Sequence, residues 1–528
     1  MADIKAVQLT IDGRTTQAAV GTTIHAAAVT MGIQIPTLCW KPGFHPSGSC
    51  MVCAVQVVGR SGFIPSCTAV VEEGLQVETS TDAVRAARRT ALELLLSDHA
   101  GDCEGLCQRG CPAGLDIPAM IRAMASDRME EALAITWKKI ALPAILGRIC
   151  PAPCEKICRR GAADAPVSIC LLKRRVGDWA LSQDPPRIPA CKPPTGQRVA
   201  IIGAGPAGLA AAFELLQAGH ACDIYDDHSV AGGGLRHAEE EGRLPAEVRA
   251  GEIERLTRMG AHWRLGTRVN LPGELTDLRR DHDAVILALG PLVAGWEKDW
   301  GQPYTDGSGW LADRVTGATG HAGIFVAGGI NHSSRLAVRA LADGRRVARG
   351  VDHWLQQGQV VGEPHRYTHQ AGPLTEAELG MLMQGADAAP RREPVHPDFT
   401  PAEAQEAAGR CLQCDCRRKT DCRLRDRADE LCAHPARFKG HRRAWEIDRT
   451  HPALIYESGK CIACGLCIEV SRRPGAAEGG GLTFWKRGLG IEVRPPWGRD
   501  WRQTLTGDPA AYVAACPTGA LAMERRWC

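Results

Sequence analysis

The stretch QRVAIIGAGPAGLAAAFELLQAGHACDIYDD, residues 197–227, decides the fold of the middle of the chain. Its first apolar run predicts a strand, GAGPAG a tight turn, the alanine- and leucine-rich run a helix, and HACDIYD a second strand. Gly203 allows the turn, Gly205 lets a pyrophosphate approach the helix N-terminus, and Gly208 permits close helix packing. Asp226 follows about twenty residues later, where a carboxylate binds ribose hydroxyls. The pattern therefore predicts a dinucleotide site in a Rossmann-like domain.

The sequence after the turn favours FAD over NAD. SVAGGGLRHAEEEGRLP (residues 229–245) resembles the GG-L and RLP run of the glutamate synthase small subunit, where the flavin lies. DAVILALG (283–290) and GIFVAGGI (323–330) resemble the two later motifs of that flavin fold. The chain departs from the family at Gly329, which replaces the usual acidic residue. Beyond the residues of the turn itself, the resemblance implies FAD contacts at Ala207, Gly233, Leu235, Arg243, Val269, Gly290, Gly328 and Gly329.

A separate NAD(P) domain is not expected inside the predicted FAD domain, residues 191–358. The glutamate synthase family carries a complete NADPH domain between the two later motifs, but here only 33 residues separate Gly290 from Ile324. A single βαβ unit takes about 30 residues or more, and this stretch has no glycine-rich turn. A bound FAD would therefore exchange electrons with clusters, a partner subunit or a small carrier. A degenerate flavin fold kept as a scaffold is the alternative.

The bulk composition excludes several classes of partner. The chain has 528 residues, enough for about three or four domains. Lys and Arg number 63 against 60 Asp and Glu, a net charge of +3 that favours neither nucleic acid nor a membrane surface. There is no secretory leader and no run of about 18 apolar residues, so we expect a soluble, cytoplasmic protein without a membrane span. In that reducing compartment the 23 cysteines are expected to bind metals.

Residues 1–80 predict a small β-rich module with a 2Fe-2S cluster. VQLTIDG and TQAAV alternate like a hairpin, GTTIHAAAVTMGI predicts a short helix, and AVQVVG and LQVET predict later strands. The module contains the four thiols Cys39, Cys50, Cys53 and Cys67. Two thiols in one tight loop with more distant partners suit a 2Fe-2S cluster, and structural zinc is the alternative. IPTLCW and SCMVCAVQV resemble the N-terminal β-grasp ferredoxin module of the large iron-sulfur subunit of NADH-quinone oxidoreductase and of cytoplasmic formate dehydrogenase and hydrogenase subunits.

Residues 81–190 predict a helical domain with two 4Fe-4S clusters. The apolar spacing is helical, and Cys-Pro pairs occur at Cys111 and Cys150. The segment resembles the N-terminal domain shared by the glutamate synthase small subunit and dihydropyrimidine dehydrogenase, but the first cysteine of that family is absent. His99 takes its place, four residues before Cys103. A neutral imidazole can bind iron, and a His-x3-Cys start also occurs in the large iron-sulfur subunit of NADH-quinone oxidoreductase.

The resemblance implies interleaved ligand sets for these two clusters. One cluster would take His99, Cys103, Cys107 and Cys158. The other would take Cys111, Cys150, Cys154 and a non-cysteine side chain near Lys173. Because lysine is a poor iron ligand, we expect the nearby Cys170 to be the fourth. A solvated His99 and a buried, non-ligating Cys170 are the alternatives.

Residues 359–400 are proline-rich and polar and predict a linker that crosses the surface. The segment 401–440 then carries five cysteines: Cys411, Cys414, Cys416, Cys422 and Cys432. The first four predict one metal site, which could be a 4Fe-4S cluster or structural zinc, since either accepts four thiolates.

Residues 441–528 predict a ferredoxin-like module with one 4Fe-4S cluster. Cys461, Cys464 and Cys467 form a CxxCxxC loop, and Cys516 precedes a proline. In two-cluster ferredoxins the remote cysteine serves the other cluster. No second CxxCxxC lies nearby, so we expect Cys516 to complete this centre. GLTFWKRGLGIEVRPPWG resembles the β-containing insert of ferredoxin modules in the same large iron-sulfur subunit.

Together these modules predict a multidomain α+β and α/β protein that transfers electrons. It would relay them within a cytoplasmic complex, such as an NAD(P)-linked formate dehydrogenase or hydrogenase, using FAD, one 2Fe-2S cluster and three to four 4Fe-4S clusters. Expected partners are an NAD(P)-reducing flavoprotein, a formate dehydrogenase- or hydrogenase-type catalytic subunit, and ferredoxin. Substrate chemistry would belong to those partners. The alternatives are a self-sufficient flavin oxidoreductase fed by ferredoxin and a zinc-stabilised assembly scaffold.

Overall fold

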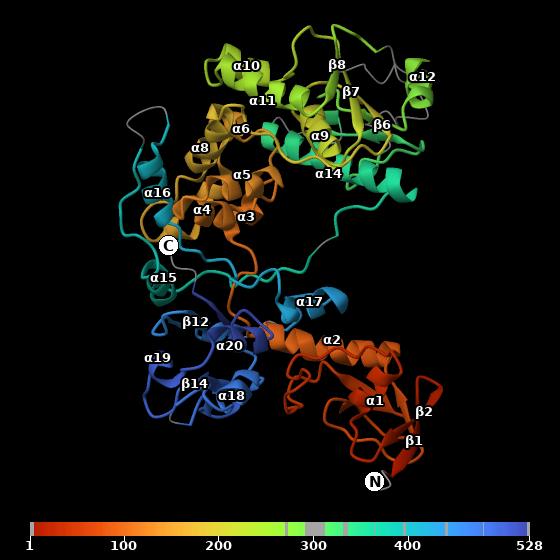
Figure 1. Ribbon diagram of the computed structural model, residues 1–528, viewed down its shortest axis with the longest axis vertical. Helices are drawn as coiled ribbons and strands as arrows, with labels where there is room; N and C mark the ends of the chain where they lie inside the picture. Colours follow the sequence, from red (N-terminus) through yellow and green to blue (C-terminus); the bar gives the residue numbers. More distant parts are fainter. Residues whose placement is uncertain are drawn as a thin grey trace. The chain divides into compact units, whose positions relative to one another are not determined.

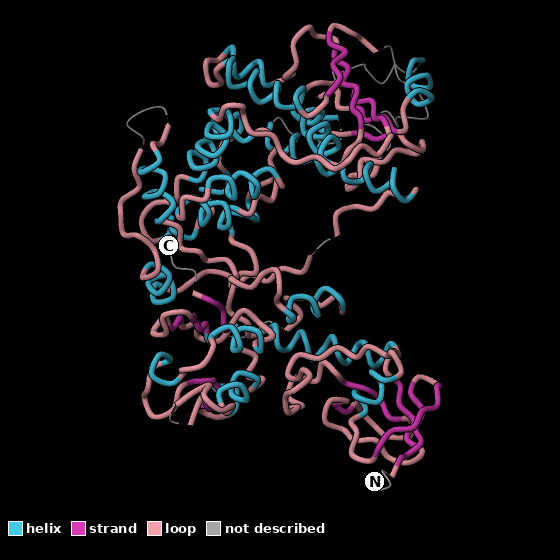
Figure 2. The backbone as a smooth tube through the Cα atoms, viewed as in Figure 1, coloured by secondary structure: helices cyan, strands magenta, loops and turns pink. Residues whose placement is uncertain are grey.

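The computed structural model of the chain describes residues 5–269, 273–290, 312–330, 336–364, 366–393, 398–438, 442–478 and 480–524. They form two compact units. The first unit consists of Met1–Glu104, Arg366–Gly385 and Cys414–Arg526, and the second mainly of Gly105–His365 and Ala386–Gln413. Each unit contains both helices and strands (Figures 1 and 2). The predicted multidomain class with ferredoxin-like modules and a Rossmann-like domain is confirmed.

The first unit begins with a five-stranded sheet in the order β2-β1-β5-β3-β4. Its elements are β1 (Ala6–Ile11), β2 (Arg14–Ala19), α1 (Ile24–Thr30), β3 (Ala54–Val57), β4 (Ile64–Pro65) and β5 (Leu75–Glu78). β1 pairs antiparallel with β2 and parallel with β5, and Ile11, Ile24 and Val55 are buried between the sheet and the helix. The hairpin, helix and two later strands predicted from the sequence are all present.

The same unit contains a second, C-terminal module. Its strands are β11 (Ile447–Asp448), β12 (Leu454–Glu457), β13 (Thr483–Trp485), β14 (Glu492–Arg494) and β15 (Leu521–Met523), and its helices include α18 (Leu466–Ser471), α19 (Trp501–Thr504) and α20 (Pro509–Ala515). β11, β12 and β15 form an antiparallel sheet, while β13 and β14 form the β-containing insert expected from the sequence. The long α2 (Asp82–Ser97) and the short α17 (Arg423–Glu430) complete the unit.

The segment 359–400 differs from the surface linker that its composition predicts. It contains α15 (Glu376–Met383), which begins with a capping box at Thr375. Tyr367 and Leu382 are buried, at 5% and 1% exposure. The overall composition of the segment is polar and proline-rich, so it does not indicate that these two residues are buried. With them, residues 366–385 belong to the first unit.

The second unit begins with short helices that surround several cysteines. They are α3 (Leu106–Gly110), α4 (Ile117–Ala125), α5 (Met129–Trp137), α6 (Pro143–Ile149), α7 (Pro153–Lys156) and α8 (Ile169–Ser182), with α16 (Pro401–Gly409) packed on α4 and α8. α6 and α8 cross closely because each has a glycine at the contact. A Cβ on Gly147 would overlap Arg174, and one on Gly177 would overlap the backbone of Ala144.

The second unit also contains the predicted Rossmann-like domain. Five parallel strands lie in the order β10-β9-β6-β7-β8: β6 (Arg198–Ile202), β7 (Ala221–Asp226), β8 (Ala261–Leu265), β9 (Ala284–Leu287) and β10 (Ile324–Val326). Val199 and Ile201 face a core shared with α9 (Pro206–Gln217) and α14 (Ala337–Gln357), while Ala200 and Ile202 face one shared with α12 (Gly273–Asp281) (Figure 1). Both faces are therefore buried, as in doubly covered parallel sheets.

α10 (Leu235–Glu240) and α11 (Ala246–Arg258) connect β7 to β8. Most of the segment between Gly290 and Ile324, in which no NAD(P) domain is expected, lies outside the described residues. Within the described ranges, no helix combines the length and the apolar character that a membrane span requires.

Candidate cofactor sites

The glycine-rich turn between β6 and α9 has the geometry of a dinucleotide site. Gly203 has a φ of +112°, and a Cβ there would overlap the Ala288 carbonyl. A Cβ on Gly208 would overlap the Gly203 carbonyl, so both positions exclude side chains. Gly205 is the N-cap residue of α9, and no side chain there bonds the first N–H groups of the helix. A Cβ added to Gly205 would have Gly233 Cα as its nearest neighbour, at 3.9 Å. The free N–H groups and the open space fit a pyrophosphate.

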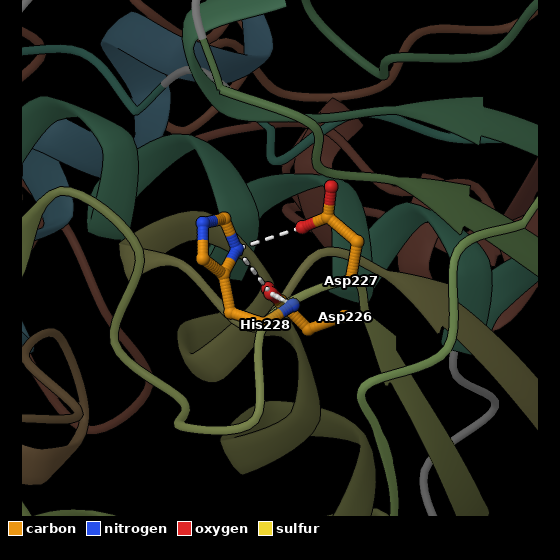
Figure 3. Close-up of side chains that lie close together, drawn as sticks. All are labelled: Asp226, Asp227 and His228. Carbon is orange, nitrogen blue, oxygen red and sulfur yellow. Dashed lines mark hydrogen bonds and ion pairs between the residues drawn. The ribbon is translucent and has the colours of Figure 1, made fainter.

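Asp226 ends β7 beside this turn, as the sequence predicts. Its Oδ2 accepts a hydrogen bond from the Ala204 N–H at 2.7 Å, and its Oδ1 accepts one from the His228 N–H at 2.9 Å. His228 Nδ1 lies 3.0 Å from Asp226 Oδ1 and 2.7 Å from Asp227 Oδ1 (Figure 3). The carboxylate thus fixes the turn to the end of the strand. Its contact with a ribose stays a prediction.

The later motif GIFVAGGI packs against α9. Gly328 has a φ of +81°, and a Cβ there would lie 2.6 Å from that of Ala207. The Gly328 N–H donates to Asp343 Oδ2 at 2.6 Å, and Asp343 is 5% exposed on α14. The sequence did not point to Asp343 because it lies fifteen residues after Gly328, outside any recognisable pattern.

The remaining predicted flavin residues occupy different environments. Leu235 is buried in the core, Val269 packs partly buried against the sheet, and Arg243 is bonded to Glu241 at the surface. Gly290 has a φ of +77°, and Gly329 lies in a short 3-10 turn, Gly328–Ile330. Their contacts with FAD stay predictions.

The four cysteines of the N-terminal module converge. Cys39, Cys50, Cys53 and Cys67 are all buried in the first unit, at 1–5% exposure. Contact with Cys50 and then Cys67 lowers the pKa of the Cys39 thiol, while contact with Cys67 lowers that of Cys53 to about 7. Ser66 donates to the Cys53 carbonyl at 2.8 Å, and this bond fixes the loop. Four buried thiols in mutual contact fit a 2Fe-2S cluster.

The second unit brings together the predicted set Cys111, Cys150, Cys154 and Cys170. Contact with Cys170 lowers the pKa of the Cys150 thiol to about 6, and burial raises that of Cys154 to about 12. Lys173, 5% exposed, lies among all four. Burial alone would lower the pKa of its ammonium, but the four thiolates outweigh burial and raise it. The lysine therefore acts as a buried counter-ion beside four thiolates, a donor set that fits a 4Fe-4S cluster.

Replacing Lys173 with methionine is expected to lower the reduction potential of the centre at Cys111, Cys150, Cys154 and Cys170. The reason is that a buried cation stabilises the more negative, reduced state, and removing it costs on the order of 100 mV at an effective dielectric constant of about 20. An EPR-monitored redox titration measures the shift. Exposed Lys156 on α7 is the matched control, because water screens its charge. Equal potentials for K173M and wild type would contradict this role.

The C-terminal module gathers Cys461, Cys464, Cys467 and Cys516 around one cavity. Its lining also includes Tyr456, Ile462, Gly465, Val493, Pro517, Thr518, Ala520 and Leu521. Burial first, and the neighbouring thiolates second, raise the pKa values of Cys464 and Cys467. The Ala463 N–H donates to Cys461 Sγ at 3.3 Å, a bond of the kind that tunes clusters. The donor set fits a 4Fe-4S cluster.

Two predicted ligand sets are divided between the units. His99 and Cys103 belong to the first unit, whereas Cys107 and Cys158 belong to the second. Likewise Cys411 belongs to the second unit, but Cys414, Cys416 and Cys422 belong to the first. Cys432 is exposed. Spacing along the chain does not reveal this division, because the division depends on contacts between distant segments. An isolated bridge, for example, pairs Asp102 with Asp415, more than three hundred residues away.

Three domain families match the chain. A 2Fe-2S iron-sulfur cluster binding domain matches residues 4–82, dihydropyrimidine dehydrogenase domain II, which carries a 4Fe-4S cluster, matches 75–185, and an NAD(P)-binding Rossmann-like domain matches 201–268.

Three characterised proteins resemble about a third of the chain. It is 40% identical over 205 residues to NADP(+)-dependent formate dehydrogenase subunit beta of Moorella thermoacetica, a match that covers 35% of this chain and 29% of that protein. It is 39% identical over 188 residues to NADPH-Fe(3+) oxidoreductase subunit beta of Geobacter sulfurreducens, covering 35% and 28%. It is 34% identical over 186 residues to the glutamate synthase [NADPH] small chain of Mycobacterium tuberculosis, covering 35% and 38%.

The chain thus spans well under half of the length of each relative. The matched segments contain the cysteines of residues 39–67 and 103–170 and the GAGPAG turn. Separate segments of the chain are thus similar to a 2Fe-2S domain, a 4Fe-4S domain and an NAD(P)-binding Rossmann-like domain, and its relatives include subunits of NADP(+)- or NADPH-dependent oxidoreductases.

Proposed function

We propose that the chain is an iron-sulfur flavoprotein subunit that relays electrons between redox partners in a cytoplasmic complex. One observation carries the proposal: three separate sets of four cysteines, each gathered within a single unit, occur in the same chain as one glycine-rich dinucleotide turn. A scaffold stabilised by zinc would need none of the electrostatic features around these thiols, such as the buried Lys173.

FAD is the dinucleotide that we assign to the turn. The α9 N-terminus and Gly205 would hold its pyrophosphate, and Asp226 would face its ribose. When bound, a flavin exchanges one or two electrons while iron-sulfur clusters exchange single electrons, so together they connect two-electron and one-electron carriers. The role of the protein is to hold the turn rigid and to place Lys173 beside the thiolates.

Partner subunits would supply the substrate chemistry. The matched relatives are named as subunits of an NADP(+)-dependent formate dehydrogenase and of an NADPH-Fe(3+) oxidoreductase. We infer that this chain likewise works with an NAD(P)-reducing flavoprotein or with a formate dehydrogenase- or hydrogenase-type catalytic subunit. A ferredoxin is a further candidate donor or acceptor.

Cofactor analysis of the anaerobically purified full chain tests this proposal. We expect about 14 to 18 iron atoms with matching acid-labile sulfide, one FAD, and broad visible absorption that dithionite bleaches. Zinc in place of iron, with a featureless visible spectrum, would instead identify a structural scaffold and remove the redox function.

A further inference from the structure

We propose that the cysteine-rich segment 411–422 serves more than one metal centre, and that Cys416 and Cys422 join His99 and Cys103 in a 4Fe-4S site within the first unit. This inference deepens the proposed function and rests on it, since it assumes that the thiols hold iron-sulfur clusters. It replaces both of the divided ligand sets that the sequence predicts. The geometry that carries it lies in residues 99–104, 369–371, 415–425, 457–460 and 517–519.

Cys103 and Cys416 are brought together by backbone pairing. Asp102 and Asp415 form an isolated parallel bridge, and a cysteine follows each of them directly. Backbones paired in this way lie about 5 Å apart, so the bridge brings Cys103 and Cys416 close together. The Cys103 thiol is in addition shielded from water: burial, and next the Cys416 charge, raise its pKa.

Cys422 is brought to the same place by α17. It is the N-cap residue of that helix, and Arg425 on the helix forms a 2.6 Å ion pair with Glu104, the residue after Cys103. The Arg425 side chain is 3% exposed and that of Glu104 is 25% exposed, so the pair is partly shielded from water. Burial and then the charges of Cys416 and Cys103 raise the pKa of the Cys422 thiol to about 12. The three thiols therefore form one group.

The loop after Cys516 contacts the sulfur atoms of Cys416 and Cys422. The Leu424 N–H donates to the Pro517 carbonyl at 3.1 Å, and Cys422 Sγ lies 4.0 Å from the same oxygen. A Cβ on Gly519 would overlap Cys416 Sγ, so this sulfur rests directly on the glycine backbone. The three-cysteine group thus adjoins the C-terminal site, a placement suited to electron exchange between two centres.

His99 is the fourth ligand that we assign. It lies four residues before Cys103, its ring contacts that of His369 at 5.2 Å, and its Nδ1 is buried without a hydrogen-bond partner. The backbone of His369 binds Cys103: its N–H donates to Cys103 Sγ at 3.3 Å, and its carbonyl accepts from the Cys103 N–H at 3.1 Å. The Nδ1 atom of His369 is likewise buried without a partner, and we assign His99 because it lies on the same segment as Cys103. An unpartnered buried imidazole nitrogen costs free energy unless it binds a proton or a metal.

Charge favours a cluster at this position. Lys460 is 1% exposed, pairs with Glu457 at 2.6 Å, and approaches both Cys416 and His99. Burial lowers the pKa of the Lys460 ammonium, but Glu457 and Cys416 more than reverse this and raise it. A buried cation offsets the negative charge of three thiolates, as Lys173 does at the other site.

Cys411 belongs to the second unit. It is buried in the core of the second unit together with Cys107, and Cys158 packs against that core. The preceding Arg410 offers its carbonyl to Arg160 Nη1 at 2.6 Å, two residues after Cys158. We therefore expect its loss to affect a different centre from the one that depends on Cys416.

Paired alanine variants of the full chain test this division through iron content and the EPR spectrum of the reduced protein. Cys103→Ala and Cys416→Ala should each abolish the same EPR signal, with loss of up to about four iron atoms. The double variant C103A/C416A should lose no more than either single variant, whereas C411A/C416A should lose two signals and up to about eight iron atoms. The reverse pattern, with C411A/C416A equal to C416A, would overturn the proposal.

Controls separate this outcome from unfolding and from failure of the proposed function. Exposed Cys432, in the same segment, should be replaceable by alanine without loss of any signal. A retained 2Fe-2S signal in each variant shows that the first unit is folded. His99→Cys should keep the iron and shift the EPR signal that C103A abolishes, while His99→Ala should remove it; an unchanged signal in both would exclude His99. Zinc instead of iron in the wild-type chain would refute the proposed function itself.

Discussion

Replacement of Gly208 by valine is expected to abolish flavin binding while the iron-sulfur centres of the first unit are retained. A Cβ at this position would overlap the Gly203 carbonyl, so the turn and α9 would have to separate. The N–H groups at the start of α9 would then no longer converge on a pyrophosphate. The measurement is the Kd for FAD of the purified chain, which should rise at least about tenfold, the effect of a loss of about 1.4 kcal/mol in binding free energy.

Gly273 provides the matched control for G208V. It lies at the start of α12 in the same unit, and nothing lies within 4 Å of its notional Cβ. G273A should therefore keep its FAD. A G208V protein with a full complement of FAD would show that the turn does not bind the flavin.

Replacement of Glu252 by alanine is expected to destabilise the helical part of the second unit by about 3–5 kcal/mol. Glu252 is fully buried, lies 3.4 Å from the 2% exposed Arg255, and accepts the N–H groups of Ala144 and Ile145 at 3.2 and 3.0 Å. Its loss would leave a buried guanidinium unpaired and the start of α6 uncapped. Because Cys150 directly follows α6, the nearby metal centre should be lost as well.

Hydrogen exchange of the α6 amides measures this effect locally, which suits a chain of several domains. The exchange rate should rise about 100-fold or more in E252A. Glu254, exposed on the same helix α11, is the control, and E254A should exchange like the wild type. Equal protection of α6 in E252A and E254A would contradict the role of the buried pair.

Local sequence patterns were sufficient to predict the individual modules. The GAGPAG turn has only one compact arrangement between a strand and a helix, and the 1–80 module follows from alternation that its buried strands require. The sets at Cys39–Cys67 and Cys461–Cys516 were predictable because nearly all of their ligands lie on short loops. Cys170 was predictable only with the help of a family resemblance, and the structure places it against Cys150.

Long-range pairing could not be predicted. The bridge between Asp102 and Asp415, the hydrogen bond from Gly328 to Asp343 and the burial of Tyr367 depend on contacts between segments separated in the chain. Spacing alone grouped Cys411 with Cys416, because four cysteines within twelve residues look like one site. In the structure Cys411 belongs to the second unit, where the Arg410 carbonyl accepts a hydrogen bond from Arg160, and Cys416 belongs to the first unit.

The central claim is that this chain carries electrons but depends on partners to exchange them with a pyridine nucleotide. Anaerobic titration of the isolated full chain, followed by visible absorption and EPR, tests it most directly. We expect dithionite to reduce the flavin and the clusters fully, whereas NADH and NADPH should reduce them only after an NAD(P)-linked partner subunit is added. Rapid reduction of the isolated chain by either nucleotide would contradict it and identify a self-sufficient oxidoreductase.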